Sequence, residues 1–457
     1  MADELTWLPG WRIRELIGKR EVSPVEVVDH FLARLEEHNP TLKVMSILDQ
    51  AGAREQAARA EKAVAAGETL GPLHGLPTAV KENIAVKGRP LMGQADRLPS
   101  HDSLAVDRLR KAGAVLVGIN TMMGTGGGGL AASRFNWDAE ARNPWNPAHV
   151  PGWSSSGGAA SAVAGLLPFT VGTDGGGSTR LPAAYSGVVG VHSTTNLIPT
   201  VDYDNAQFPS LTQSLGPLAR NVVDAAVVLQ TMAGPDGRDF TCLSVDPPDY
   251  LAHIDDGVDG MRMAWTDDFG FTDMYALEES PRVIETIRTA AMGLRSLGAT
   301  VEATDRVWED FHPGFMSSGF LFAGTAGMAR APSLDVWGDM LDLRQRNWEG
   351  FRALFQDHDV LLSPTSQLLA RTVEDWDDAW TGDGSRFAHG TFAPVYCSHT
   401  MMFNWLGFPA VTVPCGFVDG LPVGLQIIGK PASEATLFRV ANAFQKAFPQ
   451  DARPPGC

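Results

Sequence analysis

Cysteines are scarce in this chain, and so are long apolar runs. Only four cysteines occur among 457 residues, far apart and with no CxxC pair, which argues against a disulfide framework and a zinc knuckle. No apolar segment reaches about 18 residues, the length that indicates a membrane span. The N-terminal residues 1–5 show no basic segment leading into an apolar one, so no signal peptide is indicated. These absences predict a cytoplasmic protein with no membrane partner.

Basic residues are also fewer than acidic residues. The chain has 36 Lys and Arg against 53 Asp and Glu, which gives a formal net charge of −17. Binding to nucleic acid or to an anionic membrane surface requires a basic footprint, so we expect neither partner. A small neutral or cationic molecule is the expected ligand.

Several familiar catalytic motifs are missing as well. The sequence has no HExxH pair for a metal and no GxSxG elbow of an α/β-hydrolase. The run Gly124–Gly129 formally satisfies GxGxxG, but residues 134–147 after it are rich in proline and aromatics and do not predict the required helix. We therefore predict no metal and no cofactor, and assign this run to a wall of the substrate cleft rather than to dinucleotide binding.

The remaining composition is that of a globular α/β protein. Hydrophobic residues make up 44% of the chain and charged residues 19%, enough for a sizeable core. Residues 78–81 and 114–119 have strand character, residues 103–112 have helical periodicity, and Ser23 begins another helix with a capping-box pattern. A helix is also expected at residues 281–297. Alternating strands and helices favour a layered α/β structure.

A glycine-rich stretch at residues 151–192 carries two serine sites. The first contains Ser154 and Ser155, and the second contains Gly175-Gly176-Gly177-Ser178. Glycines before a serine let successive N–H groups point into one concavity that binds anions. The apolar run of residues 159–171 has room for a short helix and a buried strand, which would return the second site to the first. A serine hydroxyl still needs a base, and the candidate is Lys81.

Three segments together resemble the amidase signature family. They are residues 75–83 (GLPTAVKEN), the serines at 154 and 155, and residues 175–180 (GGGSTR); further similarity lies at residues 407–416 and 420–426. The resemblance implies one mixed β-sheet covered by helices on both sides. It also implies a single domain, 1–457, with an N-terminal helical part (1–70), a catalytic core (71–230), a variable substrate-lining region (231–395) and a C-terminal part that rejoins the core (396–450).

The same resemblance implies a Ser–Ser–Lys triad. Ser178 would be the nucleophile, Ser154 the bridging serine and Lys81 the base. In this family the bridging serine follows a cis peptide bond and precedes the nucleophile by 24 residues, which selects Ser154 over its two neighbours. Lys81 must be neutral to accept a proton, although its reference pKa is about 10.4. Burial would lower that pKa.

Other residues around the triad receive supporting roles. The amides of Gly175, Gly176, Gly177 and Ser178 are expected to form the oxyanion hole. Asp174 and Arg180 are expected to hold the shape of this loop, with a surface ion pair as the alternative. Ser155 has two interpretations, a hydrogen bond into the network or a helix N-cap.

Some positions differ from the usual pattern of the family. Trp153 stands where most relatives carry a small residue. Met123 and Gly124 depart from a common motif of the family, and Met122 is the neighbouring residue that keeps it. These four residues either border the substrate cleft or serve only the core and loops.

The function expected from these features is hydrolysis of carboxamides or related C–N acyl bonds through an acyl-enzyme. Aryl amides, alkyl amides and carbamates all fit as substrates. The alternatives are an amidotransferase subunit that passes ammonia from glutamine to an aminoacyl-tRNA, and an inactive binding protein on the same fold. A homodimer is left open.

Overall fold

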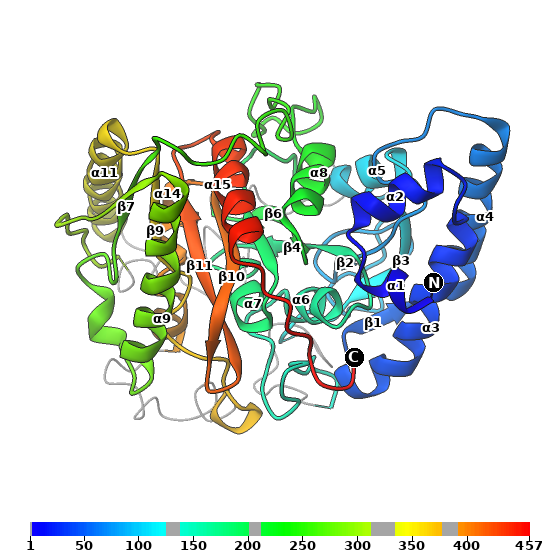
Figure 1. Cartoon of the computed structure of the whole chain (residues 1–457), viewed down its shortest axis with the longest axis horizontal. Helices are drawn as coiled ribbons and strands as arrows, with labels where there is room; N and C mark the ends of the chain where they lie inside the picture. The colour runs from blue at the N-terminus through cyan, green and yellow to red at the C-terminus, as the bar shows by residue number, and fades with distance from the viewer. Residues whose placement is uncertain (1, 125–137, 201–211, 312–333, 377–391) are drawn as a thin grey trace.

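The computed structural model describes residues 2–124, 138–200, 212–311, 334–376 and 392–457. Eleven strands form one sheet in the order β1-β3-β2-β4-β6-β5-β10-β11-β9-β7-β8 (Figure 1). The strands are β1 (Met45–Leu48), β2 (Pro77–Lys81), β3 (Val115–Asn120), β4 (Phe169–Asp174), β5 (Val189–His192), β6 (Ser214–Ala219), β7 (Arg262–Trp265), β8 (Thr300–Ala303), β9 (Val360–Pro364), β10 (Ala410–Val418) and β11 (Leu421–Ile428).

Helices flank this sheet along its whole length. They are α1 (Ala2–Trp7), α2 (Gly10–Gly18), α3 (Pro24–Leu42), α4 (Gln50–Ala66), α5 (Leu104–Lys111), α6 (Ser156–Val163), α7 (Arg180–Ser186), α8 (Val222–Met232), α9 (Ser280–Met292), α11 (Leu334–Asp357), α13 (Phe392–Cys397), α14 (Met401–Leu406) and α15 (Glu434–Ala447). The described residues also include two short 3-10 helices, η1 (Thr272–Tyr275) and η2 (Gly293–Leu297).

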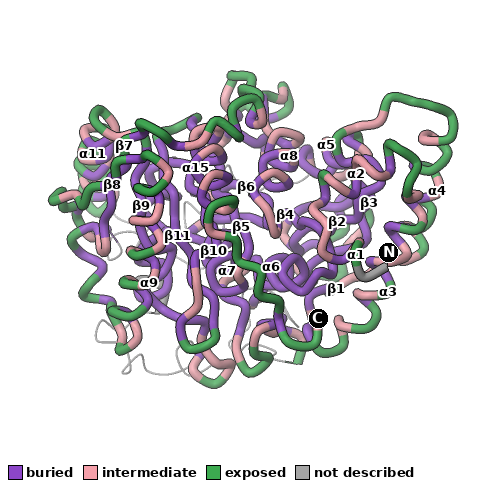
Figure 2. Tube along the Cα trace, in the orientation of Figure 1, coloured by how far each residue is buried: buried purple, intermediate pink, exposed green. Residues whose placement is uncertain are grey.

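The sheet is mixed, as expected. β2 pairs in parallel with β3 and β4, and β7 pairs in parallel with β8 and β9, while the central strands pair antiparallel. Both α6 and α8 contact β6. Leu218 of β6 belongs to a buried cluster with residues of α6, whereas the neighbouring Ala219 belongs to the larger cluster that includes residues of α8. Successive strand residues point to opposite faces, so α6 and α8 cover different sides of the sheet. Figure 2 shows the central strands and α6 and α7 buried between outer, more exposed helices.

Local sequence signals agree with this fold in most places. The capping box at Ser23 and Glu26 is present at the start of α3, and the apolar run after residue 158 forms most of α6 and the first half of β4. The predicted helix at 281–297 is wrong in its second part, because the α-helix ends at Met292 and η2 begins at Gly293, a weak helix former. All four cysteines are free thiols. The proposed division of the chain into a single domain with four parts stays a prediction.

The site depends on the parallel pairing of β2 with β4. Val80 lies opposite Val171, so the carboxyl ends of the two strands meet at the same edge of the sheet. Lys81 ends β2, and Asp174 ends β4 and leads directly into the glycine loop. Ser154 precedes α6, which packs against β2 and β4. In open α/β sheets this edge is where ligands bind.

Candidate active site

Lys81 and Ser154 lie in direct contact. The Nζ atom of Lys81 is 2.7 Å from Ser154 Oγ, and it also contacts the carbonyl oxygen of Thr173 at 3.1 Å and its Oγ1 at 2.8 Å. Sequence reasoning does not single out Thr173. Its position just before Asp174, at the end of a buried strand, is the only local signal that points to it.

The nucleophile candidate lies next to this pair. The backbone N–H of Ser155 donates to the carbonyl oxygen of Ser178 at 3.1 Å, which ties the two serine segments together. Ser178 is 6% exposed and Ser154 is partly exposed. The described residues contain no hydrogen bond between the hydroxyls of Ser154 and Ser178, so this contact of the expected relay is not made. Catalytic hydrogen bonds of free enzymes often tighten only when substrate binds.

The peptide bond before Ser154 differs from the expectation. No cis peptide bond occurs in the described residues, so the predicted cis bond at this position is not present. The trans form is the lower-energy state of any bond that does not precede proline. Lys81 reaches Ser154 Oγ with this trans bond.

Burial determines the charge of Lys81. The side chain is 2% exposed, and burial lowers its pKa to about 7, against smaller opposing effects of Asp174 and then Glu82. The low-dielectric surroundings penalise the ammonium form, whereas the two carboxylates favour it. The amine is therefore able to accept a proton near neutral pH.

Asp174 and Arg180 form an ion pair beneath the glycine loop of residues 175–178. Both side chains are fully buried, with Arg180 Nε 3.0 Å from Asp174 Oδ2 and Nη2 3.0 Å from Oδ1. The surface ion pair considered as an alternative is thus wrong. Burial raises the pKa of Asp174, but the charge of Arg180, assisted by His192 and hydrogen bonds, keeps that pKa well below its usual range.

Distant parts of the chain complete this buried pair. Asn404 donates to the carbonyl oxygen and to Oδ1 of Asp174 at 2.9 and 2.8 Å, and Gln426 Oε1 accepts from Arg180 Nη1 at 2.8 Å. Thr400 Oγ1 donates to the carbonyl oxygen of Gly176 at 2.8 Å. These residues lie more than 200 positions from the glycine loop in sequence, and no local pattern connects them to it.

His192 and Ser214 also lie beside Asp174, in an arrangement that superficially resembles a Ser–His–Asp triad. Ser214 Oγ is 2.7 Å and Asp174 Oδ1 is 3.9 Å from the same ring nitrogen, Nδ1 of His192. A relay needs one partner on each nitrogen. Burial lowers the pKa of His192 to about 3, and all three side chains are shielded from solvent. We assign this cluster to support of the loop.

The expected oxyanion hole needs one correction. The N–H of Gly177 donates to Asp174 Oδ1 at 2.6 Å, so this amide faces the buried carboxylate and is not available for a substrate oxygen. The amides of Gly175, Gly176 and Ser178 make no hydrogen bond within the described part of the chain. Gly175 is partly exposed. Three of the four predicted donors therefore remain candidates.

Ser155 has one clear role in the structure. Its hydroxyl donates to the Thr173 carbonyl oxygen at 3.2 Å, and it makes no side-chain cap bond to α6 although it occupies the N-cap position. The network interpretation holds, and the side-chain cap is wrong. The same carbonyl oxygen accepts from Lys81.

The four residues proposed to line the cleft are placed differently. Met122 and Met123 are 5% and 6% exposed, whereas Gly124 and Trp153 are partly exposed. The Trp153 ring stacks on Tyr396 with centroids 6.5 Å apart and meets Trp376 edge-on at 5.6 Å. Of the GxGxxG run, the positions after Gly124 lie outside the described residues. Of the four, Gly124 and Trp153 are therefore the two that solvent reaches, and Trp153 directly precedes Ser154. Their role in lining the cleft stays a prediction.

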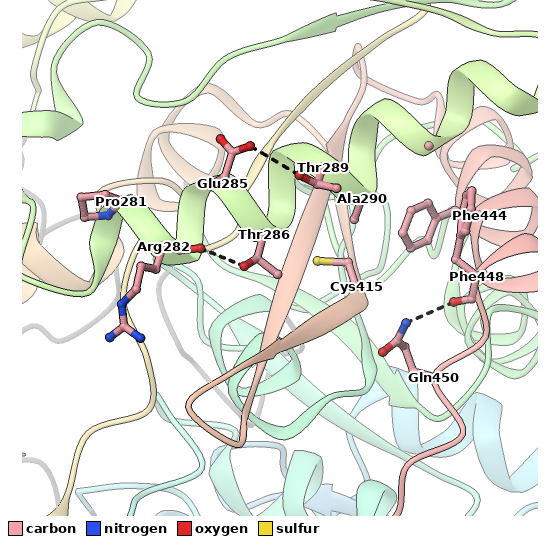
Figure 3. A pocket seen from close by; sticks show the side chains of 11 residues that line it. Pro281, Arg282, Glu285, Thr286, Thr289, Ala290, Cys415, Phe444, Phe448 and Gln450 are labelled. Atoms are coloured by element: carbon pink, nitrogen blue, oxygen red, sulfur yellow. Dashed lines mark hydrogen bonds between the residues drawn. The ribbon is translucent and has the colours of Figure 1, made fainter.

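A separate hollow of about 850 Å³ lies elsewhere, between α9, β10 and the end of α15 (Figure 3). Cys415, Phe444 and Phe448 line it, and no residue of the proposed triad does. Burial raises the pKa of the Cys415 thiol, so it is a poor nucleophile. In the described ranges no group of three or more His, Cys, Asp or Glu side chains is arranged to hold a metal ion, and no helix is long and apolar enough to cross a membrane.

Comparisons with known proteins agree with this arrangement. The family model described as Amidase matches residues 26–311 and 324–438. A glutamyl-tRNA(Gln) amidotransferase subunit of Synechococcus sp. (strain WH7803) is 34% identical, over 95% of this chain and 96% of the relative. The corresponding subunit of Desulforudis audaxviator (strain MP104C) is 32% identical, over 96% of each.

Solved structures share the fold over nearly the whole chain. A bacterial aryl acylamidase of the amidase signature enzymes has a TM-score of 0.82 at 25% identity and covers 97% of both chains. A 6-aminohexanoate cyclic dimer hydrolase has a TM-score of 0.81 at 23% identity, covering 98% of this chain and 99% of that chain. The chain belongs to the amidase signature family, and its mixed eleven-stranded sheet is the fold of that family.

Proposed function

We propose that this protein is a self-sufficient hydrolase that cleaves carboxamides or related C–N acyl bonds through an acyl-enzyme on Ser178. The observation that carries the proposal is the contact of 2.7 Å between Ser154 Oγ and the buried amine of Lys81. A neutral amine beside a hydroxyl at the edge of an anion-binding glycine loop supplies the base that a serine nucleophile needs. An inactive binding protein would have no need of a buried lysine at this point.

The proposed reaction begins with the attack of Ser178 Oγ on the carbonyl carbon. The Ser178 proton passes to Ser154 Oγ while the Ser154 proton passes to Lys81 Nζ. The net result is the transfer of one proton from Ser178 to Lys81, and Ser154 remains a neutral hydroxyl. The amides of Gly175, Gly176 and Ser178 are the donors proposed for the developing oxyanion, each worth about 3 kcal/mol of transition-state stabilisation.

The acyl-enzyme forms when the C–N bond breaks. Lys81 returns its proton through Ser154 to the leaving nitrogen, which departs as an amine or ammonia. Water then attacks the ester carbon, gives its proton to the same relay, and releases the carboxylic acid and Ser178. Proton transfer by a positioned group contributes a factor of about 10² to 10⁴. With a carbamate, the same steps release an amine or an alcohol, depending on which bond breaks.

The proposed substrate carries an aromatic or other bulky apolar group. Trp153 is partly exposed beside Ser154 and packs on two further aromatic rings, Trp376 and Tyr396, which supports such a preference. The fold similarity to an aryl acylamidase is consistent with it.

A second candidate, an amidotransferase component, has its own support. Curated relatives at 30–34% identity are glutamyl-tRNA(Gln) amidotransferase subunits, matched over nearly their full length. Such a chain would release ammonia from glutamine for a partner that holds the tRNA. The net charge of −17 counts against direct tRNA contact by this chain.

A substrate panel separates the two candidates. The isolated protein is incubated with p-nitroacetanilide, a p-nitrophenyl carbamate, simple aliphatic amides and glutamine, and the release of aniline, phenol or ammonia is measured. We expect turnover of at least one aryl substrate without any partner, and none by Ser178→Ala. Turnover confined to glutamine, and dependent on added amidotransferase subunits, would support the second candidate instead.

A further inference from the structure

Within the part of the chain that the structure describes, Lys81 Nζ has three hydrogen-bonding partners, and one of them can only accept. Nζ contacts Ser154 Oγ, Thr173 Oγ1 and the Thr173 carbonyl oxygen, at 2.7, 2.8 and 3.1 Å. A carbonyl oxygen carries no hydrogen and can only accept. A neutral amine has two N–H groups and one lone pair, so one N–H goes to the carbonyl. The other N–H and the lone pair face the hydroxyls of Ser154 and Thr173. Catalysis requires that the lone pair faces Ser154 and that the N–H faces Thr173.

The contacts of Asn83 determine which of the two hydroxyls can donate to Lys81. Thr173 Oγ1 accepts from Asn83 Nδ2 at 2.9 Å, and the Thr173 hydroxyl donates to Asn83 Oδ1 at 3.3 Å. A hydroxyl has one hydrogen and two lone pairs. The hydrogen is therefore directed to Asn83, one lone pair accepts from Asn83, and the other accepts the N–H of Lys81.

We propose that Thr173 and Asn83 are positioning residues that set the direction of the proton relay. Because the Thr173 hydrogen is held by Asn83, Ser154 is the one neighbour of Lys81 whose hydrogen reaches the amine lone pair. The inference depends on the proposed function, in which Lys81 accepts the proton from Ser154. The same arrangement fits the ammonium form, because its three N–H groups meet three acceptors. During the cycle only the hydrogen bond between Lys81 and Ser154 therefore exchanges its donor and acceptor.

The structure offers a matched control for this role. Thr170 lies on the same strand β4, is fully buried, and its hydroxyl has no hydrogen-bond partner in the described part of the chain. Thr170→Val and Thr173→Val make the same chemical change on one strand, and only the second removes a contact to Lys81. Thr173→Ser keeps the hydroxyl and loses a methyl group, so it tests packing separately.

The first measurement does not require activity. The ¹³Cε resonance of Lys81, assigned by its loss in Lys81→Met, is titrated by NMR in protein with ¹³C-labelled lysine. In the wild type, burial is countered by the charges of Asp174 and Glu82. In Thr173→Val the ammonium loses one of three acceptors, so the titration midpoint should fall below that of the wild type. Thr173→Ser and Thr170→Val should keep the wild-type midpoint.

The second measurement follows the nucleophile directly. The rate at which a fluorophosphonate labels Ser178 is measured by intact mass across pH, with Ser178→Ala as the unlabelled control. At the plateau, Thr173→Val and Asn83→Leu should label slower by on the order of tenfold to 100-fold, while Thr173→Ser and Thr170→Val match the wild type. In Asn83→Leu the Thr173 hydroxyl no longer donates to Asn83, so it can donate to the lone pair of Lys81 and compete with Ser154. Thr173 Oγ1 can still accept from the Lys81 ammonium.

The outcomes distinguish the positioning role of Thr173 and Asn83 from the proposed role of Ser178 as nucleophile. Wild-type labelling and an unchanged Lys81 midpoint in Thr173→Val would overturn the positioning role, as would a Thr173→Ser variant as slow as Thr173→Val. A wild-type protein that resists labelling, yet shows the lowered midpoint in Thr173→Val, would refute Ser178 as nucleophile while supporting the assignment of the Lys81 neighbours.

Discussion

Asp174 and Arg180 form a two-point ion pair, with both hydrogen bonds at 3.0 Å and neither side chain exposed to solvent. The two residues flank the loop that carries Ser178. The carboxylate also accepts from the N–H groups of Gly177 and Thr179 at 2.6 and 3.1 Å. The buried ion pair and these hydrogen bonds therefore fix the conformation of the loop. The amides of Gly175, Gly176 and Ser178 are the donors proposed for the oxyanion.

Removing one partner of this pair should be costly. Arg180→Leu leaves the Asp174 carboxylate buried without its cation, and we expect a loss of about 3–5 kcal/mol in the free energy of unfolding. The matched control is Arg346→Leu, which breaks a two-point pair with Glu309 whose side chains are each 53% exposed. Its cost should be much smaller, because solvent screens an exposed ion pair. Urea unfolding of both variants tests this difference, and equal losses would contradict it.

The activity should depend on the protonation of Lys81. Burial, opposed by Asp174 and Glu82, lowers its pKa to about 7, and only the neutral amine accepts a proton. Turnover of a neutral aryl amide should therefore rise with pH through about 7 and level off above it. The acid limb is checked by kcat/KM from pH 5 to 9. A profile that is flat across this range would show that Lys81 is not the base.

Lys81 should also make stability depend on pH. Its folded pKa of about 7 lies below the ordinary lysine value of 10.5, so folding favours the neutral form. The free-energy cost of burying the charged lysine is fully present below the folded pKa of about 7. It decreases as pH rises above that value and is lost above the unfolded pKa of 10.5. Lys81→Met should therefore gain more stability relative to the wild type at pH 6 than at pH 10, by an amount on the order of a few kcal/mol. Urea midpoints at the two pH values measure it, and an equal effect at both would be contrary evidence.

The glycines of the nucleophile loop should differ in their tolerance of a side chain. Gly177 has φ +122°, and an added Cβ would lie 2.9 Å from Leu181 Cδ1 and even closer to Thr400 Oγ1. Gly175 has no such conformation, and the nearest atom to an added Cβ is Gln213 Cβ at 3.9 Å. We expect Gly177→Ala to lower the thermal midpoint by several degrees and Gly175→Ala to leave it nearly unchanged. Equal midpoints would mean that the loop adapts.

Local patterns in the sequence predict much of the fold. The helix starting after Ser23 and the strand ending at Lys81 depend on capping and apolar periodicity, which act over a few residues. The same periodicity places the end of α9 too late, because the apolar spacing continues through η2 although Gly293 weakens the α-helix. Pairing of strands across the sheet is implied only by the family resemblance.

Site residues that lie in sequence motifs can be predicted, whereas residues that join the site only through strand pairing cannot. Lys81 and Ser154 lie in recognisable segments, and the structure places them in contact. Thr173 escapes sequence reasoning because its role exists only when β2 and β4 pair in parallel. The prediction for Gly177 is wrong because composition shows that an amide is present but not which way it points. Asn404 reaches Asp174 across 230 residues.

The most direct test of the proposed mechanism is to trap the acyl-enzyme. The wild-type protein is mixed with p-nitrophenyl acetate, quenched in acid within the first turnover, and analysed by intact mass and peptide mapping. We predict one added acetyl group on Ser178, absent in Ser178→Ala and formed orders of magnitude more slowly in Lys81→Ala. An acetyl group on another residue, or full turnover by Ser178→Ala, would contradict the mechanism.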